Sequence, residues 1–124
     1  MINFTEEALN TYLSEDDGGP VVMLNLLRFA TAGGASRYEE YVQQIGASGI
    51  NERYNVELIY GGSGTTALVA EAGQEWDLVA LVRYPTRRNF VDMVRDPAYQ
   101  AIEHLRSEAL IEAVLQPTSP VPIT

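Results

Sequence analysis

The 124-residue sequence contains no cysteine and no lysine, and it has one histidine, His104. Without cysteine, disulfides and thiolate chemistry are excluded. One imidazole cannot build a zinc site that needs several histidines, so we expect no metal and no cofactor. The chain also lacks an apolar run near the roughly 20 residues of a membrane helix, and its acidic start does not resemble a signal peptide. These absences predict a soluble, cytoplasmic protein.

Basic residues are scarce, which limits the possible partners. Eight arginines stand against 17 acidic residues, and the formal net charge is -9. Phosphate groups of nucleic acids and of anionic lipids are held by basic surface. We therefore expect no nucleic-acid partner and no membrane partner for this acidic chain.

Two segments, 21–29 (VVMLNLLRF) and 76–84 (WDLVALVRY), have the apolar composition of β-strands. Neither alternates apolar with polar residues, a pattern typical of strands that are covered on both faces. Further strands are predicted at 54–60 and, after a glycine-rich turn at 61–64, at 65–70. Segment 110–115 ends a helix or forms an edge strand, and we favour a short strand at 113–116.

Helix starts are marked by capping residues. Thr5 precedes two glutamates, and Ser36 with Glu39 has the spacing of a capping box. Thr86 precedes an amphipathic segment, which Asp96 with the following proline interrupts and restarts as a second helix. The chain therefore alternates predicted strands and helices.

The order strand-helix-strand, strand-helix-strand predicts an α+β fold: the ferredoxin-like split βαβ plan, an antiparallel sheet with its helices on one face. We expect one domain over 1–124, with an N-terminal helix and loop at 1–19 and an extended proline-rich tail at 117–124. Because one chain has helices for only one face, the second face of the sheet is predicted to pack on another copy, as a homodimer.

A family resemblance rests on particular motifs. These are Tyr84-Pro85, the run Asp96-Pro97-Ala98-Tyr99, and Arg106 seven residues later. Together with the two-sided strands, they make residues 21–115 similar to the domain of unknown function 1330 family, within the dimeric α/β-barrel superfamily. The resemblance implies a ferredoxin-like protomer and a barrel-like dimer. It implies no reaction, because that superfamily includes cofactor-independent monooxygenases, muconolactone isomerases, haem enzymes and plain ligand-binding domains.

Arg106 and His104 are the candidate catalytic residues. Arg106 borders the apolar stripe of its predicted helix, where it can hold a carboxylate or enolate by paired hydrogen bonds, or form an internal salt bridge. His104 is the only side chain whose ordinary pKa suits proton transfer near neutrality. Two helix positions place it about 200° from Arg106, so it is either functional alone or a surface residue.

The candidate ligand-pocket residues are polar or aromatic positions near the predicted sheet: Asn25, Tyr60, Tyr84, Tyr99 and Arg106. Asn25 interrupts an apolar strand and needs hydrogen-bond partners, from a ligand or from the protein itself. The tyrosines suit either a pocket for a flat apolar ligand or an aromatic core.

These candidate residues lead to two hypotheses of function. In the first, a homodimer binds a small, partly apolar organic acid or ketone and acts on it, if it is an enzyme, without a cofactor, by proton transfer or oxygenation. In the second, the chain is a non-catalytic dimerisation or ligand-binding module.

Overall fold

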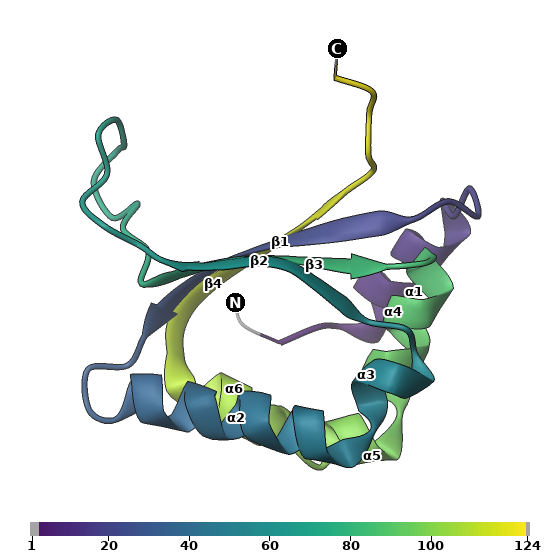
Figure 1. Cartoon of the computed structure of the whole chain (residues 1–124), viewed down its shortest axis with the longest axis horizontal. Coiled ribbons are helices and arrows are strands. Elements are labelled where there is room, and N and C mark those ends of the chain that lie inside the picture. The colour runs from purple at the N-terminus through teal and green to yellow at the C-terminus, as the bar shows by residue number, and fades with distance from the viewer. Residues whose placement is uncertain (1–2, 124) are drawn as a thin grey trace.

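The computed structural model describes residues 3–123. Its centre is a four-stranded antiparallel sheet in the order β2-β3-β1-β4. The strands are β1 (Val21–Phe29), β2 (Glu57–Ser63), β3 (Leu78–Tyr84) and β4 (Leu110–Thr118). The helices lie on one side of this sheet (Figure 1). The predicted α+β, ferredoxin-like fold is confirmed.

The helices begin where side-chain caps are available. Thr5 accepts a hydrogen bond from the Ala8 N–H, Thr86 from the Asn89 N–H, and Asp96 from the Ala98 N–H. These caps satisfy N–H groups that have no partner within the helix. The described residues form α1 (Glu6–Ser14), α2 (Gly34–Ser48), α3 (Ile50–Arg53), α4 (Arg87–Arg95), α5 (Pro97–Gln100) and α6 (Glu103–Ala109).

The start of α2 differs from the prediction. The helix begins at Gly34, not at Ser36, and no side chain caps it. A Cβ atom on Gly34 would lie 2.6 Å from the backbone oxygen of Ala109, so only glycine allows this close approach to the end of α6. A tertiary contact, and not a capping box, therefore decides where the helix starts.

The glycine-rich segment is a strand and not a turn. β2 continues through Gly61 and Gly62 to Ser63, which pairs with Leu78 of β3. The predicted strand at 65–70 is absent, and 64–77 form an irregular loop that projects from the sheet (Figure 1). β4 also runs beyond the predicted 113–116, because β1 pairs with it along nearly its whole length.

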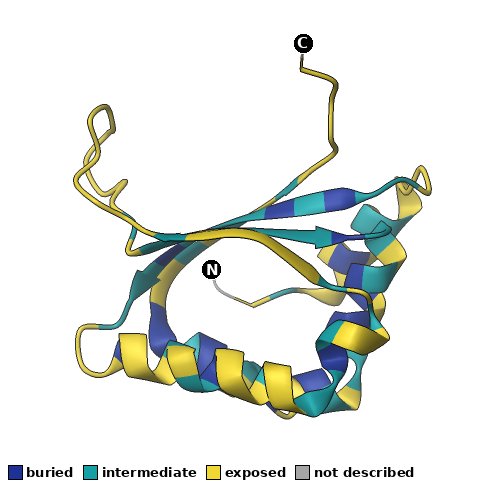
Figure 2. Ribbon diagram, in the orientation of Figure 1, coloured by how far each residue is buried: buried dark blue, intermediate teal, exposed yellow. Residues whose placement is uncertain are grey.

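The sheet presents two different faces. On the inner face, Val21, Met23 and Leu27 of β1 are almost fully buried under the helices. On the outer face, Leu24 and its partner Leu81 are only partly covered. The edge strand β2 is mostly exposed (Figure 2). The loop 64–77 and the C-terminal tail both rise on this outer side, away from the helices (Figure 1).

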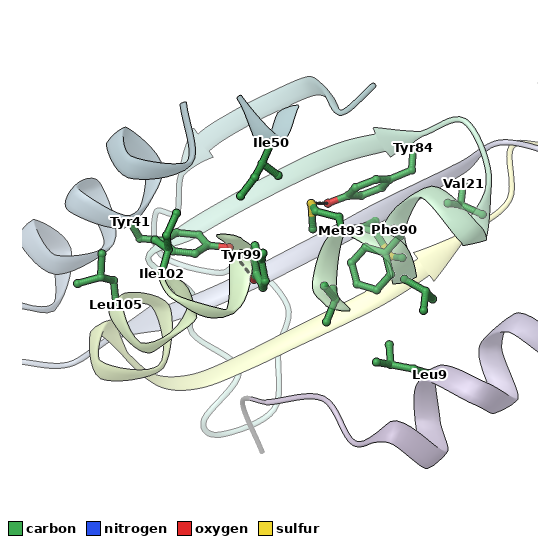
Figure 3. Packing of buried hydrophobic residues seen from close by; sticks show 13 residues of the cluster. Leu9, Val21, Tyr41, Ile50, Tyr84, Phe90, Met93, Tyr99, Ile102 and Leu105 are labelled. Atoms are coloured by element: carbon green, nitrogen blue, oxygen red, sulfur yellow. Dashed lines mark hydrogen bonds between the residues drawn. The ribbon is translucent and has the colours of Figure 1, made fainter. Parts of the chain in front are cut away.

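Aromatic side chains join the helices to the inner face. Phe90 of α4 packs edge-on against Tyr84 of β3, with ring centroids 5.1 Å apart, and edge-on against Phe4, at 5.5 Å. Edge-to-face packing aligns the positive ring edge with the negative face of its neighbour. The resulting core (Figure 3) extends over most of the sheet, but it leaves space beside these rings.

Candidate functional site

A cavity of about 330 Å³ lies between the inner face of the sheet and the helices. β1 contributes Met23 and Asn25, and the inward positions of β3 contribute Leu78, Ala80, Val82 and Tyr84. Other lining residues are Tyr38, Tyr41, Val42 and Ile45 of α2, Tyr99 of α5 and Arg106 of α6. The volume falls at the lower end of small-molecule sites. The cavity therefore suits a small ligand.

Among the described residues that line this cavity, Arg106 is the one with a charged side chain. Its side chain is only 6% exposed, although it lies in a largely apolar wall. A buried guanidinium is costly unless other groups pair with it, and Arg106 does interact with other groups of the protein. Its donors are arranged to hold a carboxylate or another planar oxygen group.

A pair of tyrosines lines the same cavity as Arg106. The hydroxyls of Tyr41 and Tyr99 lie 2.8 Å apart, and either one can be the donor (Figure 3). Only one of the two hydroxyl hydrogens is used in this bond. The pair therefore retains one hydrogen for a ligand oxygen in the cavity that both residues line.

Burial keeps these phenols protonated. Desolvation raises the pKa of Tyr38, Tyr41, Tyr84 and Tyr99, while the nearby charge of Arg106 lowers each of these pKa values and partly opposes the rise. For Tyr99, the hydrogen bond with Tyr41 also lowers the pKa. At neutral pH the cavity wall thus combines the Arg106 cation with the neutral hydroxyl groups of these tyrosines.

Asn25 adds an amide to the cavity wall. Its side-chain nitrogen lies 3.4 Å from the backbone oxygen of Met23, which is a long hydrogen bond. The strand alternation that separates Asn25 from Arg28 places the amide on the inner face, toward Ala80 of β3. A ligand or a water molecule would improve its hydrogen bonding.

Four of the five predicted pocket residues, namely Asn25, Tyr84, Tyr99 and Arg106, are thus brought together by the fold. Tyr60 is not among the residues that line this cavity. A β-bulge between Leu58 and Tyr60 reverses the alternation of β2, so that Leu58 points to the cavity while Tyr60 pairs with Leu81 on the outer face. No sequence signal marks this bulge.

His104 does not belong to the cavity. Its side chain is exposed on α6, whereas Arg106, two residues later, is buried. This is the separation that helical geometry predicts. A catalytic role for His104 therefore stays a prediction, and it would lie outside this cavity.

Sequence reasoning did not identify Tyr38 and Tyr41 as site residues, although both line the cavity. Their spacing is equally typical of core packing, and only the contact between Tyr41 and Tyr99, 58 residues apart in the chain, reveals their polar ends as neighbours. A tyrosine whose partner is far away in sequence carries no local signal of function.

A second cavity of about 330 Å³ lies beside the first, under α1. Ala8, Leu9 and Tyr12 of α1 line it, with Ala113 and Pro117 of β4. The Tyr12 hydroxyl is buried and has no hydrogen-bond partner within residues 3–123, so a water molecule or a ligand atom would satisfy it. The two cavities share five of their lining residues, Phe4, Met23, Phe90, Arg106 and Leu115.

Fold and cavity define an α+β, ferredoxin-like protein with a small apolar chamber that contains a buried arginine. No family model and no curated protein matches the chain. A protein of unknown function from Rhodopseudomonas palustris has a similar solved structure, at 29% identity over 98% of each chain and a TM-score of 0.87. Family membership beyond this likeness therefore stays a prediction.

More distant structures share the fold alone. A hydroxynitrile lyase from Passiflora edulis is 9% identical over 86% of this chain and 98% of its own, with a TM-score of 0.65. A dimeric ferredoxin-like protein of unknown function from Thermobifida fusca is 13% identical over 84% of this chain and 93% of its own, with a TM-score of 0.56. The fold thus occurs both in an enzyme and in proteins without a known activity.

The described residues offer neither a cluster of metal ligands nor a membrane-spanning helix. Within 3–123, no three histidine or acidic side chains are grouped closely enough to hold a metal ion. Nor does any helix in that range combine the length and apolarity that crossing a membrane requires.

Proposed function

We propose that the protein is a homodimeric small-molecule-binding protein whose cavity accepts a small, partly apolar organic acid or ketone. The observation that carries this proposal is the position of Arg106, a buried guanidinium in an apolar chamber, close to the Tyr41 and Tyr99 hydroxyls. Such a wall offers hydrogen-bond donors and positive charge. A carboxylate, an enolate or a polarised carbonyl is the complementary ligand group.

The apolar part of the ligand would lie against the sheet. Met23, Ala80, Val82 and Leu115 supply surface without hydrogen-bonding groups. Desolvating a charged ligand head is costly unless it is paired, and Arg106 supplies the pairing. A neutral hydrocarbon of the same size would use the walls but leave these donors unused.

Chemistry in this cavity would have to use its own polar groups. The ionisable side chains that line it, within residues 3–123, are tyrosines and Arg106. They can stabilise negative charge that develops on a bound oxygen, as a cofactor-free proton transfer or oxygenation requires. The hydroxynitrile lyase among the structural neighbours supports such small-molecule chemistry for the fold only.

The alternative is a non-catalytic ligand-binding or dimerisation module. The same lining favours it, because raised tyrosine pKa values make these phenols poor bases at neutral pH. Turnover of a bound acid or ketone would separate the two hypotheses. Saturable binding without turnover would favour the module.

The homodimer is proposed from the outer face of the sheet. Val22, Leu24, Leu26 and Leu81 are apolar and partly exposed there in a single chain. Solved ferredoxin-like neighbours are described as dimeric. Packing this face on a second copy would bury each side chain with a gain of roughly 1.5–3 kcal/mol if it were otherwise left in water. A barrel-like dimer, membership of the domain of unknown function 1330 family and a cytoplasmic location complete the proposal.

A thermal-shift series tests the ligand class. Benzoate and acetophenone represent the acid and the ketone, and toluene is the size-matched hydrocarbon. Ligands that bind only the folded state raise the melting temperature with concentration. We expect shifts for benzoate and acetophenone that exceed the shift for toluene and that weaken in Asn25→Ala. Equal shifts for all three compounds would contradict the proposed recognition of oxygen.

A further inference from the structure

We infer that Phe4 is a specificity-determining residue, a partition between the two cavities that limits the length of the ligand. This inference rests on the proposed function, because it treats the Arg106 cavity as the site that binds the ligand. Phe4 lines both cavities, and so does Arg106. A ligand held at Arg106 therefore has one chamber on each side of the Phe4 ring.

The partition consists of two rings over the sheet. Phe4 and Phe90 pack edge to face with their centroids 5.5 Å apart, and Met23 and Leu115 lie beneath them in both cavity walls. Phe90 is 5% exposed and also packs on Tyr84, so it belongs to the core. Phe4 is only partly buried and precedes the first helix, so its ring is the member of the pair that can change without loss of the sheet core.

Contacts on both sides of Phe4 hold the ring in place. Before it, Asn3 accepts a hydrogen bond from the Ser107 hydroxyl of α6, at 2.7 Å. After it, α1 is fixed to α4, because Arg87 stacks over the Tyr12 ring at 4.6 Å and Arg95 pairs with Glu6 at 3.3 Å. The position of the ring therefore follows from tertiary contacts, and not from the local sequence.

The consequence is a limit on ligand size. An apolar chain that grows from a head group at Arg106 gains affinity about fourfold for each methylene it buries. The gain stops when the chain reaches the partition. Removing the Phe4 ring joins the first chamber to the second, whose wall carries Ala8, Leu9 and Ala113. Longer chains would then continue to gain affinity.

The test measures dissociation constants by calorimetry for straight-chain monocarboxylates from butanoate to dodecanoate, and for the matching primary alcohols. The proteins are the wild type, Phe4→Leu and Phe4→Ala. Leu9→Ala is the control, since it enlarges the second chamber without opening the partition. We expect affinity to level off at a longer chain in Phe4→Ala than in the wild type, at an intermediate length in Phe4→Leu, and at the wild-type length in Leu9→Ala.

The two ligand series separate the partition from the proposed function. If the levelling point moves for both series but acids bind no better than alcohols, the partition holds and recognition of acids at Arg106 fails. If acids bind better but level off at the same chain length in every folded variant, the proposed function stands and the partition is refuted. If neither series binds any of the proteins, both are refuted.

Discussion

Replacing Arg106 with methionine is the most direct perturbation of the proposed site. Methionine retains an unbranched apolar stem, so the wall loses its charge and its hydrogen-bond donors without a large void. Arg106 is 6% exposed, which means that water cannot take its place freely. We therefore expect binding of benzoate to weaken while the fold persists.

The magnitude follows from the kind of bond that is removed. Hydrogen bonds to charged groups contribute about 1.5–3 kcal/mol each, and 1.36 kcal/mol corresponds to a factor of ten. Loss of one such interaction with the carboxylate predicts a dissociation constant about 10- to 150-fold higher. Arg106→Lys retains the charge but not the planar fork, and its loss should be smaller.

Calorimetry with benzoate measures this change, and tyrosine absorbance at alkaline pH provides a second readout without any ligand. Since the Arg106 charge lowers the pKa of Tyr41 and Tyr99, ionisation of the buried phenols should begin at higher pH in Arg106→Met. Arg88→Met is the control, because Arg88 is exposed on α4 and its pair with Asp92 lies at the surface. A folded Arg106→Met protein that binds benzoate with wild-type affinity would refute the proposed role.

Three further predictions concern assembly, packing and pH. Leu24→Glu places a charge on the outer face and should convert the proposed dimer to monomers in sedimentation velocity, whereas an unchanged dimer would exclude this face as the interface. Gly34→Ala should lower the free energy of unfolding by about 1–3 kcal/mol, because the new Cβ atom clashes with Ala109. Gly46 lies in the same helix with open space around it, so Gly46→Ala should raise the free energy of unfolding by about 0.5–1 kcal/mol. Equal effects of the two substitutions in urea unfolding would argue against the close approach at Gly34. Because burial raises the tyrosine pKa values, the contribution of these tyrosines to stability should be complete below their unfolded pKa of about 10 and should fall as the pH rises above it. The hydrogen bond from Tyr54 lowers the pKa of Asp96. Asp96 should therefore contribute to stability above its unfolded pKa of about 4 and lose this contribution as the pH falls through its folded pKa. Urea unfolding free energies that stay constant from about pH 9 to about pH 11 would contradict the alkaline part.

Local chemistry was sufficient to predict much of the fold from the sequence. Thr5, Thr86 and Asp96 can satisfy free N–H groups within three residues of themselves, and all three begin helices. The apolar run of β1 was equally informative, because a strand without alternation needs cover on both faces. The helix-strand order then leaves few arrangements of the sheet.

The candidate site was predicted only in part, because its geometry depends on residues that are distant in the chain. Sequence patterns identified Asn25, Tyr84, Tyr99 and Arg106 as polar or aromatic positions beside apolar stripes. They could not show that Tyr41 meets Tyr99, since that contact joins α2 to α5 across the cavity. Nor could they place Tyr60, which a single bulge in β2 turns from the inner face to the outer face.

The contrast between local sequence pattern and tertiary contact also explains the glycines of β2 and the N-terminal segment. Gly61 and Gly62 are typical turn residues, yet pairing with β3 holds them in a strand, because hydrogen bonds between strands can outweigh a weak local preference. Tertiary packing likewise places the Phe4 ring in the walls of both cavities. Capping and hydrophobic pattern act over a few residues and so can be read from the chain, whereas the cavity, its proposed partition and the buried Arg106 exist only once distant segments are packed together.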